Sequence, residues 1–176
     1  MKNVNWNDVQ DDIRRPVPGG YAARITAVED DEDKEYLLIR WDFAEGEYKG
    51  VNQETFAAFD FWPMAFVKSY KQKALRFFKG FKIAVEESNR NYTFKNDPQS
   101  LVGKFMGVVL GEEEYVAKDG SVKTRLYVAE VRSGRAIRDG DYKIPALKKL
   151  PANTGASAPA TNDYAVLTDD DAELPF

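Results

Sequence analysis

YLLIRWDF, from Tyr36 to Phe43, is the stretch that decides the fold of this chain. Its side chains alternate with a period of two, which is typical of a β-strand with one face against a core. One face carries Leu37, Ile39, Trp41 and Phe43, and the other carries Tyr36, Leu38, Arg40 and Asp42. The alternation therefore predicts a strand over residues 36–43 whose Trp41 face is buried and whose Arg40 face points outward.

Two further strand patterns flank this stretch. The first covers residues 21–28 and precedes an acidic loop at residues 29–33. One of its faces carries Tyr21, Ala23, Ile25 and Ala27. The second covers residues 51–59 and follows the turn sequence EGEYKG at residues 45–50. Together these patterns predict three successive strands in the first third of the chain.

The middle of the chain predicts one helix and a hairpin. Apolar residues recur at helical spacing after residues 60–63, and Gly80 is a typical helix stop, so a helix is predicted between these points. The strands predicted at residues 105–115 and 122–131 are joined by Asp119-Gly120, a strong hairpin turn. Three strands, a helix and two strands is the element order of an OB-fold. We therefore expect a mainly β protein with one helix, folded as a closed five-stranded barrel.

The 176 residues divide into a body and a tail near residue 150. Residues 151–162 read PANTGASAPATN, with no charge and no large apolar side chain, which is typical of a flexible linker. All 25 Lys and Arg residues lie in residues 1–150 with 24 of the Asp and Glu residues, which gives a charge of +1 there. Residues 151–176 hold the other 5 acidic residues and no basic one. We predict a single domain over residues 1–150 and a disordered acidic interaction tail over residues 151–176.

The composition excludes several classes of function. The chain has no Cys and no His, so disulfides, thiolate metal sites and His-based catalytic triads are excluded. It also lacks the phosphate-binding loop, the dinucleotide-binding glycine motif and the metalloprotease helix motif. No apolar run reaches transmembrane length, and the first residues lack a signal-peptide core. We therefore expect a cytoplasmic, non-catalytic protein without cofactor, metal or membrane association.

Basic residues gather in two stretches, whereas acidic residues gather near residue 30 and in the tail. The first basic stretch runs from Lys68 to Lys82 without an acidic residue, and the second runs from Lys123 to Lys149. An ordinary solvent-exposed face accounts for any single cation. A segregated set with aromatic rings beside it, however, is typical of a groove that holds phosphates and stacks bases. The predicted nucleic-acid-binding residues are Arg40, Lys68, Lys71, Lys79, Lys82, Lys123, Arg125, Tyr127, Arg132 and Arg135.

The tail ends in DDDAELPF, residues 169–176. Pro175 opposes a regular helix or strand, and a terminal Phe ring with its carboxylate suits a partner's apolar pocket that offers cationic or N–H donors. A frayed acidic end that keeps the protein soluble is the simpler alternative. The predicted partner-binding residues are Asp169, Asp170, Asp171, Leu174, Pro175 and Phe176. We also expect the acidic tail to occupy the basic groove when DNA is absent.

Two motifs resemble those of bacteriophage single-stranded DNA-binding proteins. DDDAELPF is similar to the acidic tip of bacterial single-stranded DNA-binding proteins, with Ala172-Glu173 interrupting the usual order. PGGYxAxIxxVE, from Pro18 to Glu29, together with EGEYKG, is similar to the opening of a family of phage replication proteins with an OB-fold. The resemblance implies sequence-independent binding of single-stranded DNA in the cytoplasm of an infected bacterium. It also implies that the tail recruits phage or host replication and recombination proteins.

Two other functions fit parts of the sequence. A phage adaptor or assembly protein would act through the tail without binding DNA. A metal-dependent nuclease would use clustered carboxylates, although the acidic clusters lack the spacing of a calcium loop. The sequence does not fix the oligomeric state and is compatible with a homodimer.

Overall fold

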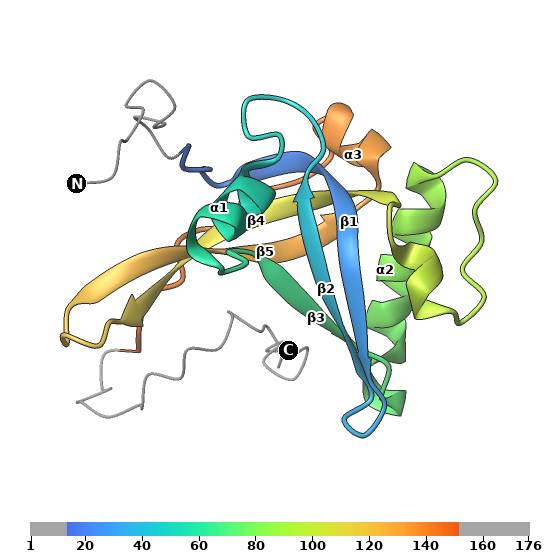
Figure 1. The fold of residues 1–176 in the computed structure, drawn as a ribbon, viewed down its shortest axis with the longest axis horizontal. Helices are drawn as coiled ribbons and strands as arrows, with labels where there is room; N and C mark the ends of the chain where they lie inside the picture. The colour runs from blue at the N-terminus through green and yellow to red at the C-terminus, as the bar shows by residue number, and fades with distance from the viewer. Residues whose placement is uncertain (1–13, 152–176) are drawn as a thin grey trace, which may run out of the picture.

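The computed structural model describes residues 14–151, which form a five-stranded antiparallel sheet with three α-helices (Figure 1). The strands are β1 (Gly19–Asp31), β2 (Tyr36–Phe43), β3 (Ala65–Ser69), β4 (Phe105–Val116) and β5 (Val122–Arg132). The helices are α1 (Val51–Phe59), α2 (Leu75–Ser88) and α3 (Gly134–Arg138). The predicted disordered tail and its partner-binding residues, from Asp169 to Phe176, lie outside the described residues.

The sheet has the strand order β3-β2-β1-β4-β5. β3 and β5 are its two edges, and no backbone ladder joins them within residues 14–151. The mainly β fold is therefore confirmed, whereas a barrel closed by hydrogen bonds is not formed by the described strands. The expectation of a single helix is wrong, because this part of the chain contains α1 and α3 besides α2.

β2 begins and ends where the alternation predicts. The four side chains of its Trp41 face belong to the core, and each is at most 2 % exposed. Trp41 and Phe43 pack edge-to-face, with their ring centroids 5.0 Å apart. Full burial of a large apolar side chain stabilises a fold by about 1.5–3 kcal/mol. The strongest pattern in the sequence therefore marks an element whose inward face lies wholly in the core.

β1 is longer than predicted and changes phase once. Ile25 lies opposite Trp41, but Ala27 lies opposite Arg40, so Thr26 is an extra residue in the ladder and forms a β-bulge. The bulge turns Ala27 outward and places Val28 in the core. The predicted inward position of Ala27 is therefore wrong, because strict alternation cannot represent an inserted residue.

The segment 51–59 is helix α1 and not the predicted third strand. Its first turn is capped by the buried carboxylate of Asp42 in β2, which accepts hydrogen bonds from the N–H groups of Asn52 (3.1 Å) and Gln53 (3.0 Å). A carboxylate at a helix N-terminus satisfies free N–H groups and interacts favourably with the helix dipole. The cap comes from ten residues earlier in the chain, which is why the local pattern does not reveal it.

The third strand is β3, which lies within the segment predicted to be helical. Ala65, Phe66 and Val67 are buried in succession, so both faces of this strand are covered. An apolar run of this kind is compatible with either a helix or a strand when only its periodicity is considered. Pairing with β2 decides for the strand.

Helix α2 begins later and ends later than predicted. It passes through Gly80, where a stop is expected, and its buried residues Phe81, Ala84 and Val85 follow that glycine. Glycine inside a helix costs about 1 kcal/mol relative to alanine. Burial of these three side chains offsets that cost, so the helix continues to Ser88.

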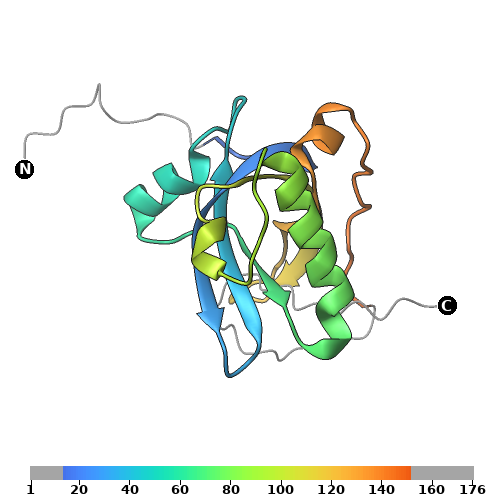
Figure 2. The ribbon, with the colours of Figure 1, turned by 90° about the vertical axis from the view of Figure 1, so that its right-hand side faces the viewer.

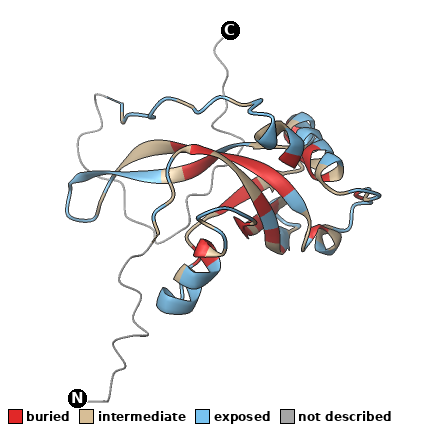
Figure 3. Ribbon diagram, turned by 90° about the horizontal axis from the view of Figure 1, so that it is seen from above, coloured by how far each residue is buried: buried red, intermediate tan, exposed pale blue. Residues whose placement is uncertain are grey.

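The β4–β5 hairpin is confirmed, with Gly120 in the left-handed conformation at its turn. Its tip extends beyond the rest of the sheet, and Figure 3 shows that the tip and most of α1 are exposed while the buried residues concentrate in the sheet. Phe56 and Phe59 of α1 are both exposed. The tip of the hairpin and α2 lie at opposite ends of the body (Figures 1 and 3).

Part of the outward side of the sheet is poor in side chains of its own. We call it the glycine face, and it carries Gly20 of β1 and Gly107 and Gly111 of β4. A Cβ atom at any of the three would collide with side chains from the C-terminal part of the body. Those side chains, in the same order, belong to Tyr142, Ile137 and Pro145. The glycines therefore let α3 and the residues after it lie close to the backbone of the sheet.

The segment that follows α3, residues 139–150, runs along the side of the body, and we call it the strap (Figure 2). The Lys148 N–H donates to the Glu112 carbonyl (3.0 Å), and the Lys148 carbonyl accepts from the Glu114 N–H (2.8 Å). These bonds fix the strap to the part of β4 that extends beyond β1. The strap thus completes the glycine face.

Candidate nucleic-acid interface

The outward side of β2 carries Arg40, the first of the predicted DNA-binding residues. Arg40 lies opposite the small side chains of Ala27 in β1 and Ala65 in β3. Its Nη1 forms a 2.7 Å ion pair with Oε1 of Glu29. Ion pairs that are partly exposed contribute about 0–1 kcal/mol. Arg40 can therefore exchange this carboxylate for a phosphate oxygen at little cost.

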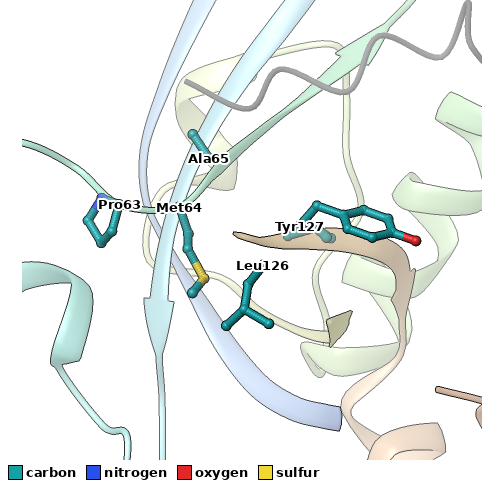
Figure 4. A pocket seen from close by; sticks show the side chains of 6 residues that line it. Pro63, Met64, Ala65, Leu126 and Tyr127 are labelled. Carbon is teal, nitrogen blue, oxygen red and sulfur yellow. The ribbon is translucent and has the colours of Figure 1, made fainter. Parts of the chain in front are cut away.

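The two edges of the sheet meet at a small pocket beside Arg40. It is lined by Pro63, Met64 and Ala65 at the start of β3 and by Leu126, Tyr127 and Val128 of β5. Figure 4 shows Met64 and Leu126 extending into the space between the two edges. Side chains thus close the gap that the backbone leaves between β3 and β5.

Tyr127 does not offer the exposed stacking surface that the sequence predicts. It is 5 % exposed, and Nζ of Lys148 in the strap lies 4.2 Å from its ring centroid. Burial raises the pKa of the Tyr127 hydroxyl, and the carboxylate of Glu113 adds to this effect. The predicted alternation is right, since Tyr127 and Arg125 share a face. The strap covers the Tyr127 ring. The alternation of side chains within β5 cannot reveal this contact, because the strap comes from a later part of the chain.

Two predicted cations lie on the β4–β5 hairpin. Nε of Arg125 forms a 2.7 Å pair with Oε1 of Glu113, which lies directly opposite it in the ladder. Nζ of Lys123 lies 3.8 Å from Oδ2 of Asp119 at the turn. Both cations are about half exposed, so their carboxylates shield them only in part.

Another group of predicted cations lies at the end of β3 and along α2. Nζ of Lys68 is 6.0 Å from the Phe66 ring centroid. Lys82 pairs with Glu86 (3.1 Å). The Phe94 N–H and Lys82 lower the pKa of Glu86. The remaining two, Lys71 and Lys79, form no ion pair within the described residues. Lys79 is exposed, and Lys71 is half-buried.

Arg132 and Arg135 lie at the end of β5 and on α3. Arg132 pairs with Glu130 (2.9 Å), and this contact raises the pKa of the guanidinium. Arg135 pairs with Asp139 one helical turn along (3.5 Å). Both arginines lie beside the glycine face and away from the hairpin tip (Figure 1).

The structure therefore brings together only part of the predicted set. Arg40 and Arg125 lie on either side of the pocket between β3 and β5, with Tyr127 buried beside them. The cations of α2 lie at the opposite end of the body from those of the hairpin (Figures 1 and 3). A single groove that contains all ten residues is not formed. Sequence reasoning leaves Lys148 out of the set, although this residue belongs to the second basic stretch.

The described part of the chain contains no group of three or more acidic side chains placed to hold a metal ion. None of its helices is long and apolar enough to cross a membrane. A scan against protein-family models found no match to this chain, and a search of curated proteins found no relative.

Proposed function

We propose that this protein is an OB-type barrel that binds single-stranded DNA without sequence preference and without catalysis. The observation that carries the proposal is the pocket where β3 and β5 meet, with Arg40 on one side and Arg125 and Lys148 on the other. An OB barrel is partly open and binds oligonucleotides on the face of its second and third strands. The order β3-β2-β1-β4-β5 is compatible with such a barrel opened between its third and fifth strands.

The charges at this site suit a ligand that competes with carboxylates. Arg40 and Arg125 each pair with a glutamate, and in each pair one of the two side chains is about half exposed. Phosphate oxygens accept the same bidentate hydrogen bonds as a carboxylate. A DNA strand can therefore take over these arginines and leave the glutamates to water, and each exchange costs little because the original pairs are weak.

Titration with oligo-dT tests the proposal through the intrinsic Trp and Tyr fluorescence. We expect tight binding whose affinity falls as salt rises, with a log–log slope of about −0.7 per phosphate contact. Duplex DNA of the same length should bind more weakly, because its bases are not available for stacking. A protein that binds neither DNA, or whose affinity is insensitive to salt, would contradict the proposal.

The proposal assigns the acidic tail to the recruitment of phage or host replication and recombination proteins through Asp169–Asp171 and Leu174–Phe176. Deletion of residues 163–176 should then tighten binding of oligo-dT most strongly at low salt, where charges are least screened. Equal affinities of the full chain and the truncated chain across salt concentrations would remove the idea that the tail competes for the groove.

An adaptor that binds another protein is the second candidate, and one observation favours it. The C-terminal half of α1 exposes Phe56 and Phe59 with two alanines between them. Exposed apolar patches of this kind mark protein-binding surfaces more often than DNA-binding ones. A mobility-shift assay with single-stranded DNA separates the candidates, because an adaptor would not shift the oligonucleotide.

A further inference from the structure

A cluster of cations and aromatic rings lies at the β1–β4 ladder, outside the residues that the sequence singles out. Phe105 is 47 % exposed, although it is a large apolar residue. Cζ of Arg24 lies 5.9 Å from its ring centroid. Beside it, Nζ of Lys104 lies 4.6 Å from the ring centroid of Tyr92. We call these four residues the Arg24–Phe105 cluster.

The Phe105 backbone is held in place on both sides. On one side it pairs with Arg24 in the ladder between β1 and β4. On the other side, the Asn89 side chain replaces a strand: its Nδ2 donates to the Phe105 carbonyl (2.7 Å) and its Oδ1 accepts from the Phe105 N–H (3.0 Å). An exposed ring on a fixed backbone loses little freedom when a flat ligand stacks on it.

Gly103 lies beside the Arg24 guanidinium. This glycine has a φ of +83°, a left-handed conformation that side chains disfavour, and a Cβ atom there would be in ordinary contact with Nη2 of Arg24, at 3.6 Å. The Gly103 N–H also donates to the Ile25 carbonyl (2.8 Å), which fixes the loop against β1. The guanidinium is therefore directed along the surface beside the Phe105 ring.

The cluster differs in charge from the predicted sites. Within residues 14–151, neither Arg24 nor Lys104 forms an ion pair, whereas Arg40 and Arg125 both do. The nearest ladder partner of Arg24 with a negative charge is Asp42, but that carboxylate is buried and accepts three backbone N–H groups. The carboxylates of Asp97 and Glu86 lie near the Tyr92 hydroxyl and raise its pKa, although burial of the hydroxyl raises it more. The cluster thus presents two cations that form no ion pair within residues 14–151.

We propose that the Arg24–Phe105 cluster is a second contact site for single-stranded nucleic acid, in which Phe105 stacks on a base and Arg24 and Lys104 hold the neighbouring phosphates. This inference rests on the proposed function. Arg24 and Arg40 both lie on the outward side of the sheet, on adjacent strands, and Asp42 lies between them in the ladder. The start of α1 covers Asp42, so a strand of DNA that reaches from the pocket between β3 and β5 to the cluster would pass beside that helix.

Three variants of the full-length chain test the inference with oligo-dT. Phe105→Ala removes the ring, and Arg24→Gln/Lys104→Gln removes the two cations. The matched control, Lys143→Gln/Lys149→Gln, removes two exposed cations from the strap. All these side chains are exposed or half-exposed, and circular dichroism will verify that each variant is folded.

The ring variant and the cation variant should differ in how their DNA binding depends on salt. Phe105→Ala should weaken binding about fivefold to tenfold at every salt concentration, since stacking does not depend on counterions. The cation variant should weaken binding and make the log–log salt slope shallower by about 1.4, because two phosphate contacts are lost. The control should leave both quantities near their wild-type values.

The outcomes separate the inference from the proposed function. Wild-type binding that is unaffected in both cluster variants overturns the second site and leaves the proposed function in place. An equal loss in the strap control also overturns it, because the effect would then be one of overall charge. No binding of oligo-dT by the wild-type protein would overturn the proposed function and the second site together.

Discussion

The two ends of the outward face of strand β1 are built in opposite ways. Near its start, Gly20 lies on the glycine face, where the sheet supplies space and the strap and α3 supply the side chains. Four residues later on the same side of the strand, Arg24 points outward with its own long side chain beside Phe105. The outward side of β1 thus passes from a region that is completed by its own chain to a region that presents cations and a ring.

This difference indicates which part of the surface supports the fold and which part can bind a ligand. A face made of glycines is useful only when something packs against it closely, since glycine costs stability in a strand. Here Ile137, Tyr142 and Pro145 provide that packing. The face with Arg24 and Arg40 has side chains that extend from the sheet, and these can change partners. We infer that the glycine face stabilises the fold and that the arginine-bearing face is the one used for binding.

The largest expected effect comes from filling the glycine face. In Gly107→Val, the new side chain would collide with Ile137 and with the Ser133 carbonyl oxygen, which lies 2.9 Å from the Cβ position. We expect a loss of about 3 kcal/mol in the free energy of unfolding, at the upper end for overpacked sites. Thermal unfolding should show a Tm lower by about 10 °C.

Gly80→Ala is the matched control for that prediction. Gly80 lies in α2, and a Cβ atom there meets nothing within 4 Å. The substitution should stabilise the protein by about 0.5–1 kcal/mol, because alanine is the better helix former. Destabilisation by both substitutions would show that the glycine face has no special need for glycine.

The next effect concerns the helix on the arginine-bearing side. Asp42→Ala removes the acceptor for the N–H groups of Phe43, Asn52 and Gln53 and leaves them without a partner in a buried position. We expect a loss of about 2 kcal/mol in denaturant unfolding, since each buried donor left unpaired costs about 1–3 kcal/mol and α1 can relax in part. Asp33→Ala, in the exposed β1–β2 turn, should change stability by less than about 0.5 kcal/mol. Similar losses in both would mean that the cap contributes nothing.

A smaller effect compares two arginines that each form an ion pair with a carboxylate. Arg40 pairs with Glu29 on the arginine-bearing face, and Arg135 pairs with Asp139 on α3. Arg40→Gln should weaken binding of oligo-dT about fivefold, as expected for the loss of one charge-assisted contact. Arg135→Gln should leave the affinity unchanged. An equal loss of affinity at both positions would instead support the single groove that the sequence predicts.

The smallest effect is a pH dependence at the end of β3. Burial raises the pKa of Tyr70 to about 12, and the hydrogen bond from its hydroxyl to Asp30 (2.8 Å) and nearby acidic residues add to this. Below pH 10 the hydroxyl is protonated in both states and has no pH effect. Between about pH 10 and about pH 12 the unfolded chain loses this proton and the folded chain keeps it, so stability falls as pH rises. Denaturant unfolding of Tyr70→Phe should show a shallower fall over this window than the wild type, and equal falls would contradict the assignment.

The sequence predicts the parts of the fold that depend on neighbouring residues. Alternation locates β2, and Asp119-Gly120 locates the β4–β5 hairpin. The helix α1 is missed because its cap, Asp42, lies in another strand. The segment that contains β3 is misread because its apolar run fits two periodicities.

The candidate site is predicted in the same uneven way. Alternation correctly turns Arg40 outward, but it cannot show that Lys148, about twenty residues after Tyr127 in the chain, covers that ring. Arg24 is outward by the same alternation, opposite in phase to Ile25. Arg24 is absent from the predicted set because a single cation in a strand does not indicate a binding site until its neighbours in space are known.

The β-bulge at Thr26 has a consequence for the reliability of folding. A shift of one residue in a strand moves its apolar side chains to the opposite face of the sheet. The two halves of β1 are out of phase with each other, and the extra residue lets Ile25 and Val28 both face the core against the regular strand β2. If the ladder formed without the bulge, one of these two side chains would be exposed to water. The relative positions of Arg24 and Arg40 therefore depend on an irregularity of the main chain.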